Sequence, residues 1–328
     1  MFKMAAVQAA PAFLDKAGTT AKIVALIQEA GANGADIIGF PETFLPGYPG
    51  WVELLPLSEE PARKLFTKLF HEAVEVPGPE TDAIGAACKE ANIYAVVGVN
   101  EKRRGTTGTL WNTSLFFGRD GTLLHKHQKY TPTIGEKLIH APGETGSKTS
   151  INTDFGPVSS LICGENGNAL AQYSVGLDYP VVHVASWPPH FSIGGLVGDL
   201  AKVISAGVSL TLGCYVINSI ALVDDAAIEA YGESEAIRDY LRSTQQKRQS
   251  SIIGPRGAVL AQGSDDESIV YAEGDTDTLI RHKYSLVGCS FNKSLEQGTL
   301  TIALQDYAGS GHYNRPELFA HHFEKYFS

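Results

Sequence analysis

Three residues of this chain have types and local contexts that fit one chemistry, the attack of a nucleophile on a carbon bound to nitrogen. Glu42 lies in the segment FPETFLPGYP, Lys129 in HQKYTP and Cys163 in LICGEN. A thiol, a carboxylate that takes its proton and an ammonium that holds negative charge are the minimum set for attack on a nitrile or amide carbon. The sequence therefore predicts a hydrolytic site built on a cysteine.

Each of these residues also has a structural interpretation. A lone cysteine after an apolar strand is usually a buried packing residue, and Cys88, Cys214 and Cys289 keep that interpretation. Glu42 alone would more often be a solvated loop carboxylate, but its Pro and Phe neighbours favour exclusion of water and a raised pKa. The local pattern does not decide between Lys129 and Lys126.

Composition predicts one well-packed domain over residues 1–328. The chain has 43% hydrophobic and 19% charged residues, and no linker divides it. Its net charge of −10 argues against nucleic acid or an anionic membrane surface as partner, since both favour basic patches. The expected partner is a small molecule.

Signals for targeting, metal and cofactor are missing from the sequence. No apolar stretch reaches the roughly 20 residues that span a bilayer, and the first apolar run breaks too early for a secretory signal. Four scattered cysteines without a CxxC pair predict reduced thiols. No HExxH, GxGxxG or GxxxxGK[ST] motif stands in a suitable context. We expect a cytoplasmic protein that needs no metal or cofactor.

Hydrophobic periodicity predicts strands alternating with helices, an α/β arrangement of two half-sheets covered by helices. The expected strands are 4–9, 36–40, 93–99, 111–117, 122–129, 157–163, 180–186, 214–221, 251–254, 258–262 and 268–273. The expected helices are 19–32, 61–73, 81–91, 167–174, 196–208, 225–231 and 234–242. The strands between 93 and 129 should form an antiparallel patch beside the βα units.

These elements place two of the candidates at strand ends. Pro41 cannot donate to a sheet ladder, so it stops a strand and leaves Glu42 at the carboxyl end, where α/β sheets tend to place ligand chemistry. The apolar run before Cys163 should end at the sheet edge, with Gly164 allowing a sharp turn into a helix. A helix N-terminus favours the thiolate.

The motifs resemble those of the nitrilase branch of the carbon–nitrogen hydrolase superfamily. Residues 34–49 fit the first family signature at every defined position, and Cys163, Glu165, Asn166 and Leu170 meet the second. The resemblance continues through 100–101, 110–118, 185–188 and 311–317. The chain departs from the second signature at Ser159, Ser160, Gly164, Ala169 and Gln172, which bears on substrate preference and on oligomer contacts. The resemblance implies a C-terminal tail from about 285, in which a segment near 287–308 carries extra residues relative to a common nitrilase tail.

The resemblance implies a four-layer α-β-β-α sandwich of two mixed sheets covered by helices, and it assigns roles. Cys163 would be the nucleophile, Glu42 the base, and Lys129, rather than Lys126, the cation. Glu136 would be a second glutamate that supports the lysine or positions water. The backbone N–H of Gly164 would help to stabilise charge on the substrate.

Three further residues keep two interpretations each. Glu165 either caps backbone donors or orients substrate, while Tyr48 and Trp187 either wall the substrate pocket or pack in the core. The resemblance also implies a homo-oligomer, a dimer or larger, formed through helices on the outer sheet face.

Three functions remain open from the sequence. The first is a nitrilase that forms acid and ammonia through a cysteine thioimidate and thioester; the CGENGN segment at Cys163 is similar to arylacetonitrilases and favours aryl- or arylalkyl-nitriles. The second is an amidase or an amide-forming nitrile hydrolase with the same Glu-Lys-Cys triad. The third is a non-catalytic assembly or ligand-binding member, which an intact triad disfavours.

Overall fold

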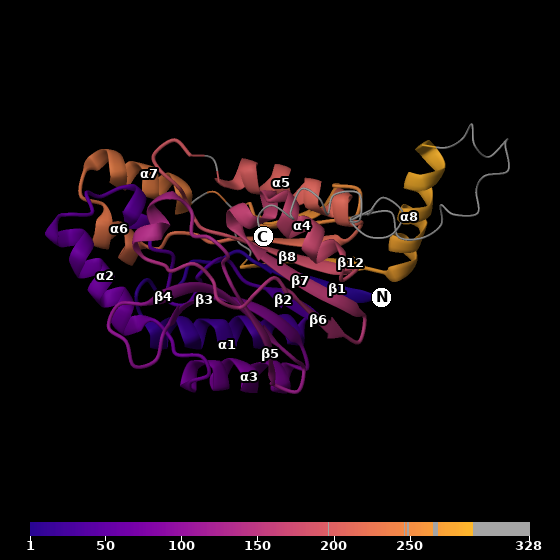
Figure 1. Cartoon of the computed structure of the whole chain (residues 1–328), viewed down its shortest axis with the longest axis horizontal. Coiled ribbons are helices and arrows are strands. Elements are labelled where there is room, and N and C mark those ends of the chain that lie inside the picture. Colours follow the sequence, from indigo (N-terminus) through magenta and orange to yellow (C-terminus); the bar gives the residue numbers. More distant parts are fainter. Residues whose placement is uncertain (196, 246, 248, 265–267, 291–328) are drawn as a thin grey trace, which may run out of the picture.

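The computed structural model contains two sheets packed face to face, with helices on both outer faces (Figure 1). It describes residues 1–195, 197–245, 247, 249–264 and 268–290, without the side chains of 284–290. The resulting order of layers, α-β-β-α, confirms the expected sandwich of two mixed sheets.

The first sheet carries the elements that lead to Glu42 and Lys129. Its strand order is β12(Ile269–Gly274), β1(Phe2–Val7), β2(Ile37–Gly39), β3(Tyr94–Lys102), β4(Leu110–Phe117) and β5(Leu123–Gln128). Strands β1, β2 and β3 are parallel, whereas β4 and β5 add antiparallel pairs, as expected. Its outer helices are α1(Lys16–Ala32) and α3(Pro79–Ala91).

The second sheet carries Cys163. Its order is β11(Val259–Gln262), β10(Ser251–Ile253), β9(Tyr215–Ile220), β8(Val182–Trp187), β7(Gly156–Ile162) and β6(Ser150–Thr153). Helices α4(Ala169–Gly176) and α5(Val197–Leu212) cover its outer face (Figure 1). Strand β6 is not predicted from the sequence, because its four residues, SINT, contain one apolar side chain.

The remaining helices lie at the ends of the sandwich. Helices α2(Glu60–Glu72), α6(Asp225–Tyr231) and α7(Glu235–Gln245) gather at the left end in Figure 1. The unpredicted helix α8(Thr276–Ser290) follows β12. Residues 291–308 of the extra segment and the 311–317 motif lie outside the described residues. Within the described ranges, no helix combines the length and the apolar character needed to cross a membrane.

Alternating burial explains how both faces of each sheet are filled. Along β1, Met4 and Ala6 join the cluster between the two sheets, while Ala5 and Val7 join the cluster beneath α1 and α3. Such alternation follows from the two-residue period of a strand. The sheets approach so closely at Gly39 that an added Cβ would lie 2.8 Å from the side chains of both Val184 and Ile217.

A second close approach fixes the loop that carries Glu42. Residues 41–43 cross directly over β3 at Gly98, where an added Cβ would lie 2.2 Å from the carbonyl oxygen of Pro41 and 2.7 Å from the backbone nitrogen of Thr43. Only glycine leaves room for this backbone contact. The loop after β2 is therefore held against the first sheet and aims toward the second.

Candidate active site

Cys163 occupies a strained turn at the end of β7. Its φ is +51°, and it begins a short 3-10 helix, η3(Cys163–Gly167). The sequence-based expectation that Gly164 makes the turn is wrong: the left-handed backbone lies at the cysteine itself, and Gly164 has open space around a hypothetical Cβ except for Thr133 Oγ1 at 3.7 Å. Non-glycine residues with positive φ are costly and concentrate at functional sites.

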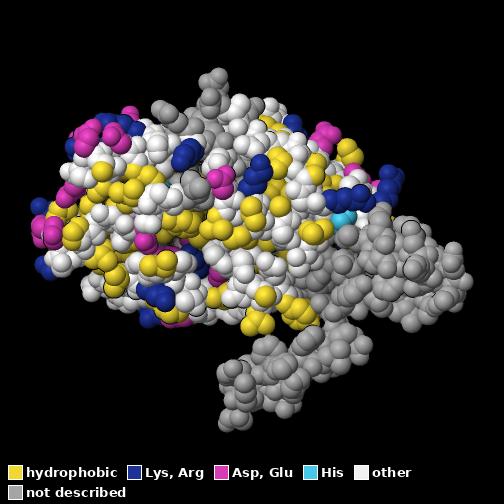
Figure 2. Space-filling view, turned by 90° about the horizontal axis from the view of Figure 1, so that it is seen from above, with side chains coloured by type: hydrophobic (Ala, Val, Ile, Leu, Met, Phe, Trp, Pro, Cys, Tyr) yellow, Lys and Arg dark blue, Asp and Glu magenta, His cyan; other side chains and the backbone are white. Residues whose placement is uncertain are grey.

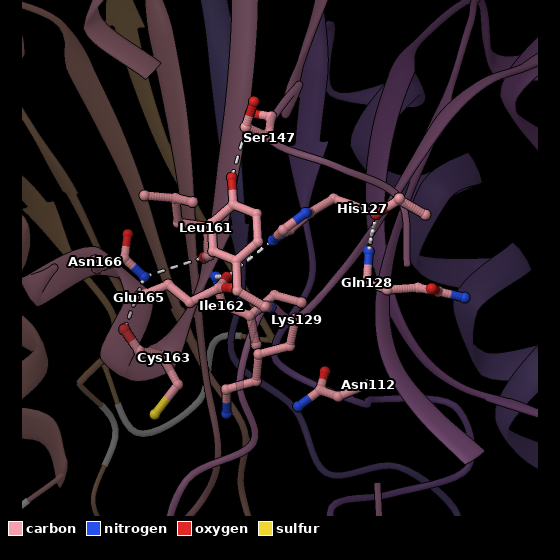
Figure 3. Close-up of polar contacts among 12 residues, drawn as sticks. Asn112, His127, Gln128, Lys129, Ser147, Leu161, Ile162, Cys163, Glu165 and Asn166 are labelled. Atoms are coloured by element: carbon pink, nitrogen blue, oxygen red, sulfur yellow. Dashed lines mark hydrogen bonds and ion pairs between the residues drawn. The ribbon is translucent and has the colours of Figure 1, made fainter. Parts of the chain in front are cut away.

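Asn166 and Glu165 hold this turn. Asn166 Nδ2 donates to the carbonyls of Leu161 and Cys163, both at 3.0 Å, and Glu165 Oε2 accepts from the backbone N–H of Ile162 at 2.9 Å (Figure 3). These contacts satisfy backbone groups at a strand end that regular structure leaves unpaired. The strain at Cys163 is thus maintained by its own neighbours in sequence.

Glu165 also connects the cysteine turn to the lysine segment. Its Oε1 accepts from the backbone N–H of Tyr130 at 2.6 Å, and its Oε2 lies 2.9 Å from His127 Nε2. Tyr130 directly follows Lys129 in the chain. Of the two interpretations offered by the sequence, these contacts describe a residue that binds the backbone on both sides of the site.

Lys129 joins two buried carboxylates. Its Nζ lies 2.7 Å from Glu42 Oε1 and 2.6 Å from Glu136 Oε2, and all three side chains are at least 98% buried. Glu136 is part of a second 3-10 helix, η2(Ile134–Leu138), which begins at the strained residue Ile134 with φ +44°. The structure therefore brings together the three charged candidates that the sequence placed 87 and 7 residues apart.

Asn112 is a polar member of this cluster that the sequence did not single out as a site residue. Its Nδ2 donates to Glu42 Oε1 at 2.6 Å and to Glu136 Oε1 at 2.7 Å. In Figure 3, the ends of Asn112, Lys129 and Cys163 point toward the same region. A fully buried asparagine inside β4 was the available signal, because strands disfavour Asn and buried amides need partners.

The two carboxylates of the site differ in how readily they take up a proton. Burial raises the pKa of Glu42 to about 7, although Lys129 opposes the shift. Burial acts the same way on Glu136, yet Lys129, His140 and Asn112 outweigh it and bring the pKa of Glu136 below its ordinary value. One carboxylate is therefore ionised throughout the neutral range, while the other exchanges a proton near neutrality.

The lysine and the cysteine complete the electrostatic arrangement. Burial by itself would lower the pKa of Lys129, but Glu42 and Glu136 raise it well above its ordinary value, so the ammonium persists. Burial and then Glu42 raise the pKa of Cys163, with Lys129 and a hydrogen bond from the Gly164 backbone acting in the opposite sense. The resting cysteine is a thiol that needs a base before it attacks.

Glu42 has an oxygen suited to that task. Its Oε1 accepts from Lys129 and Asn112, whereas its Oε2 is buried and makes no hydrogen bond to any described residue. A free carboxylate oxygen in a dry site is a strong proton acceptor. The arrangement therefore has a thiol, an unoccupied base and a fixed cation within one electrostatic network.

The two aromatic candidates occupy different positions. Tyr48 lines a hollow that Glu42 also borders, and the hollow is mostly apolar. Its other lining residues include Pro11, Phe13, Phe44, Pro189, Leu222, Val223 and Tyr231. Trp187 lies fully buried in the cluster that contains Cys163, and its carbonyl accepts from the backbone N–H of Glu42 at 3.3 Å. Trp187 thus supports the backbone of Glu42, while Tyr48 faces the hollow.

The other described cysteines have different surroundings. Burial raises the pKa of both Cys88 and Cys214 to about 12, with no neighbouring carboxylate among the causes. All three cysteines with described side chains are free thiols. In the part of the chain that the structure describes, no group of three or more His, Cys, Asp or Glu side chains could hold a metal ion.

Comparison with known proteins gives consistent results for sequence and fold. The model of the family described as "Carbon-nitrogen hydrolase" matches residues 3–284. A nitrilase of Paraburkholderia phymatum is 30% identical over 98% of this chain and 86% of its own length, and an arylacetonitrilase of Macrophomina phaseolina is 30% identical over 96% and 89%. Saccharomyces cerevisiae Nit3, a member of branch 10 of the nitrilase superfamily, shares the fold with a TM-score of 0.65 at 19% identity, covering 92% of this chain and 95% of Nit3.

Proposed function

Because this chain belongs to the carbon–nitrogen hydrolase family and to its nitrilase branch, and is thus a hydrolase of carbon–nitrogen bonds, we propose that it converts aryl- or arylalkyl-nitriles to carboxylic acid and ammonia through a covalent intermediate on Cys163. The observation that carries the mechanism is the buried Glu42–Lys129–Glu136 cluster, which interacts electrostatically with the cysteine. No metal or cofactor takes part in the proposed route.

In the first half of the reaction, Glu42 takes the thiol proton as Cys163 attacks the nitrile carbon. The carbon–nitrogen triple bond becomes a double bond, and the proton passes from Glu42 to the nitrogen, giving a thioimidate. Lys129 and the Gly164 N–H stabilise the charge that develops on nitrogen. A well-placed donor of this kind contributes on the order of 3–4 kcal/mol to the transition state.

In the second half, water replaces the nitrogen. Glu42 removes a proton from water, whose oxygen adds to the thioimidate carbon, and passes this proton to the nitrogen, giving a tetrahedral intermediate with a hydroxyl and an amino group. As the carbon–nitrogen bond breaks, the hydroxyl proton moves to the nitrogen through Glu42, ammonia leaves, and a thioester remains. A second water cleaves the thioester to the carboxylic acid and restores the thiol. Glu136 holds Lys129 in place and stays ionised while Glu42 gains and loses its proton.

The substrate class is supported by the likeness to an arylacetonitrilase over most of the chain. Phe13, Phe44, Tyr48 and Tyr231 contribute rings to the hollow beside Glu42, whose free volume of about 10 Å³ is that of about one water molecule. These rings make the surroundings of Glu42 apolar, which is compatible with an aromatic substrate.

Product analysis tests the proposed function. Purified protein is incubated with arylaliphatic, aromatic and aliphatic nitriles and with the matching amides, while ammonia release and product mass are followed. We expect acid and ammonia from arylaliphatic or aromatic nitriles. Activity on amides alone would move the chain to the amidases, accumulation of amide would identify early collapse of the tetrahedral intermediate, and preference for aliphatic nitriles would overturn the substrate class.

The rate should fall on the acid side of neutrality. Glu42 must be ionised to accept the thiol proton, and its pKa lies at about 7. We therefore expect kcat/KM to decrease roughly tenfold per pH unit below that value, with the apparent pKa belonging to the coupled thiol and carboxylate. Rates measured between pH 5 and pH 9 provide the check, and a constant kcat/KM from pH 5.5 to pH 8 would contradict the role of Glu42.

We further propose that the chain forms a homo-oligomer, a dimer or larger, through the outer face of the second sheet. Figure 2 shows hydrophobic side chains spread over the face seen from above, the side of α4 and α5 in Figure 1. Large apolar residues exposed on or near these helices are Leu170, Leu177, Tyr179, Leu200, Val203 and Leu210. Exposed apolar patches of this kind mark protein–protein contacts.

A charge placed on this face should weaken assembly. Val203 on α5 is 71% exposed, so Val203→Asp changes the surface without removing core contacts. We expect a lower molar mass by analytical ultracentrifugation. Leu124→Asp on β5, whose leucine is 42% exposed, is the control and should leave the mass unchanged. An unaltered assembly in Val203→Asp would place the interface elsewhere.

Two remaining expectations stay proposals. We propose a cytoplasmic location, supported by three buried cysteines that are free in the structure. We also propose one domain over 1–328 with a C-terminal tail from about 285. The family match ending at residue 284 is compatible with that boundary.

A further inference from the structure

A buried histidine contacts the second carboxylate of the site. His140 Nδ1 lies 3.1 Å from Glu136 Oε1, and its Nε2 lies 2.8 Å from Asn100 Oδ1. The ring is fully buried. Which ring nitrogens carry hydrogen is decided by these two partners, because water does not reach the ring.

The orientation of Asn100 fixes the hydrogen on Nε2. Asn100 Nδ2 donates to the carbonyl oxygen of Gly47 at 2.9 Å and, less closely, to that of Leu45 at 3.4 Å. Both oxygens are pure acceptors, so the amide NH2 must face them and Oδ1 must face the histidine. An amide oxygen only accepts. His140 Nε2 therefore carries a hydrogen and donates it to Asn100.

The contacts of Glu136 require a hydrogen on Nδ1 as well. Glu136 Oε2 accepts from Lys129 Nζ and from the backbone N–H of Thr133, and Oε1 accepts from Asn112 Nδ2. Every one of these partners is a donor, as expected around an ionised carboxylate. A bare Nδ1 lone pair facing such a group would be repelled, whereas an N–H is attracted.

We propose that His140 is held as an imidazolium and acts as a positioning residue, so that two buried cations, Lys129 and His140, balance the two buried carboxylates, Glu42 and Glu136. Three charged groups belong to the hydrogen-bond network around His140: Glu136 from η2, Lys129 after β5 and Glu42 after β2. Strand β3 contributes the neutral Asn100. The catalytic consequence of a charged His140 rests on the function proposed above.

The second cation explains how Glu42 remains usable as a base. With His140 charged, Glu136 is balanced by the imidazolium, and the ammonium of Lys129 is left to favour the ionised form of Glu42. With a neutral residue at 140, Lys129 alone would face two carboxylates. Removal of a neighbouring charge moves a carboxyl titration by about 1–3 pH units, so Glu42 would hold its proton at neutral pH.

The protonation state of His140 is measured directly and without turnover. Full-length wild-type protein labelled with 15N and 13C in histidine gives ring nitrogen resonances, assigned through bonds to the His140 backbone. We expect both His140 nitrogens to show the shifts of protonated imidazolium at pH 7.5. A ring with hydrogen only on Nε2 would overturn the proposal, whatever the enzyme's activity.

A kinetic test separates this role from simple support of the fold. In His140→Gln, or His140→Asn if the longer amide does not fold, we expect the acid limb of kcat/KM to move up by about 1–2 pH units. Because the wild-type pKa of Glu42 is about 7, the loss is then about 5–50-fold at pH 7 and recovers toward pH 9. His125→Gln, which removes a half-buried histidine bonded to the Lys148 carbonyl, should leave the profile unchanged.

The two proposals fail in different ways. An equal loss at every pH in His140→Gln would assign His140 a structural role and overturn this inference, while the nitrilase proposal would stand. Activity that survives Cys163→Ala would overturn the proposed mechanism, while the ring resonances of His140 would still report its charge.

Discussion

Cys163→Ala is expected to abolish formation of acid and ammonia, with kcat lowered on the order of 10⁴-fold or more. The substitution removes the atom that would bond to the substrate carbon, and the remaining groups cannot form a thioimidate. Loss of a nucleophile in comparable covalent enzymes has effects of this size. Ammonia release and product mass, measured across the same nitriles and amides as for the wild type, provide the test.

The fold should survive this change, so the loss can be assigned to chemistry. Alanine at position 163 removes one sulfur atom, at a cost of about 1 kcal/mol for a small buried group. Cys214→Ala is the matched control: Cys214 is fully buried like Cys163 but has no neighbouring carboxylate. We expect its activity to stay within about twofold of wild type. Turnover that persists in Cys163→Ala would show that another group attacks the substrate.

The sequence predicted the ends of strands β2 and β7 well. These strand ends placed Glu42 and Cys163 correctly. Pro41 terminates the segment after β2, and the apolar run of β7 ends at Ile162. Both signals are local: a missing backbone donor and the end of an apolar run. Local signals also predicted the helices α1–α7, whose caps and stripes lie within a few neighbouring residues.

The hydrogen-bond network around the charges was not predictable in the same way. Asn112, Asn100 and His140 lie on or beside strands of the first sheet, and, apart from the contact between His140 and Glu136 four residues apart, their partners are 24 to 70 residues away. No periodicity reports a contact at these larger separations. The sequence does show polar residues at positions where burial is expected. Each such residue must have a hydrogen-bond partner, but the sequence does not identify that partner.

The turn at Cys163 shows a second limit of local reasoning. Glycine is the residue that most easily takes a positive φ, so Gly164 was the natural choice from the sequence. The structure places the strain one residue earlier, where Asn166 and Glu165 bind the flanking backbone groups. Side-chain hydrogen bonds from neighbouring residues override the intrinsic backbone preference at this position, and strained residues of this kind concentrate at functional sites.

Lys129→Met should have the largest effect on stability. The change leaves Glu42 and Glu136 buried without their shared ammonium, and breaking a buried ion pair from one side costs about 3–5 kcal/mol. Activity should fall at least 10³-fold, because the charge that stabilises the substrate nitrogen is lost. Urea unfolding at pH 8, followed by fluorescence, gives the free energy of unfolding, and ammonia release gives the activity.

The dependence on pH distinguishes an unpaired carboxylate from a packing defect. Without the ammonium, the folded-state pKa of Glu42 rises further above its unfolded value and that of Glu136 rises from its lowered value, so the native state binds more protons relative to the unfolded state than it does in the wild type. Stability therefore falls as pH rises through this window, and the loss is larger at pH 8 than at pH 5. A loss of the same size at both pH values would indicate that only packing was disturbed.

Two companion variants make the interpretation specific. Lys126→Met removes the other candidate lysine, whose ammonium is partly exposed and paired with the buried Glu101. It should cost less stability than Lys129→Met, with activity retained, because Thr113 and Gln128 still donate to Glu101. Glu42→Gln keeps the Lys129–Glu136 pair and should leave the fold near wild-type stability while abolishing turnover. Adding Glu42→Gln to Lys129→Met removes a carboxylate that the lost ammonium left uncompensated, so the double variant should recover part of the lost stability. If the two changes were simply additive, the carboxylate and the ammonium would not be coupled, and the proposed electrostatic role of Lys129 would fail.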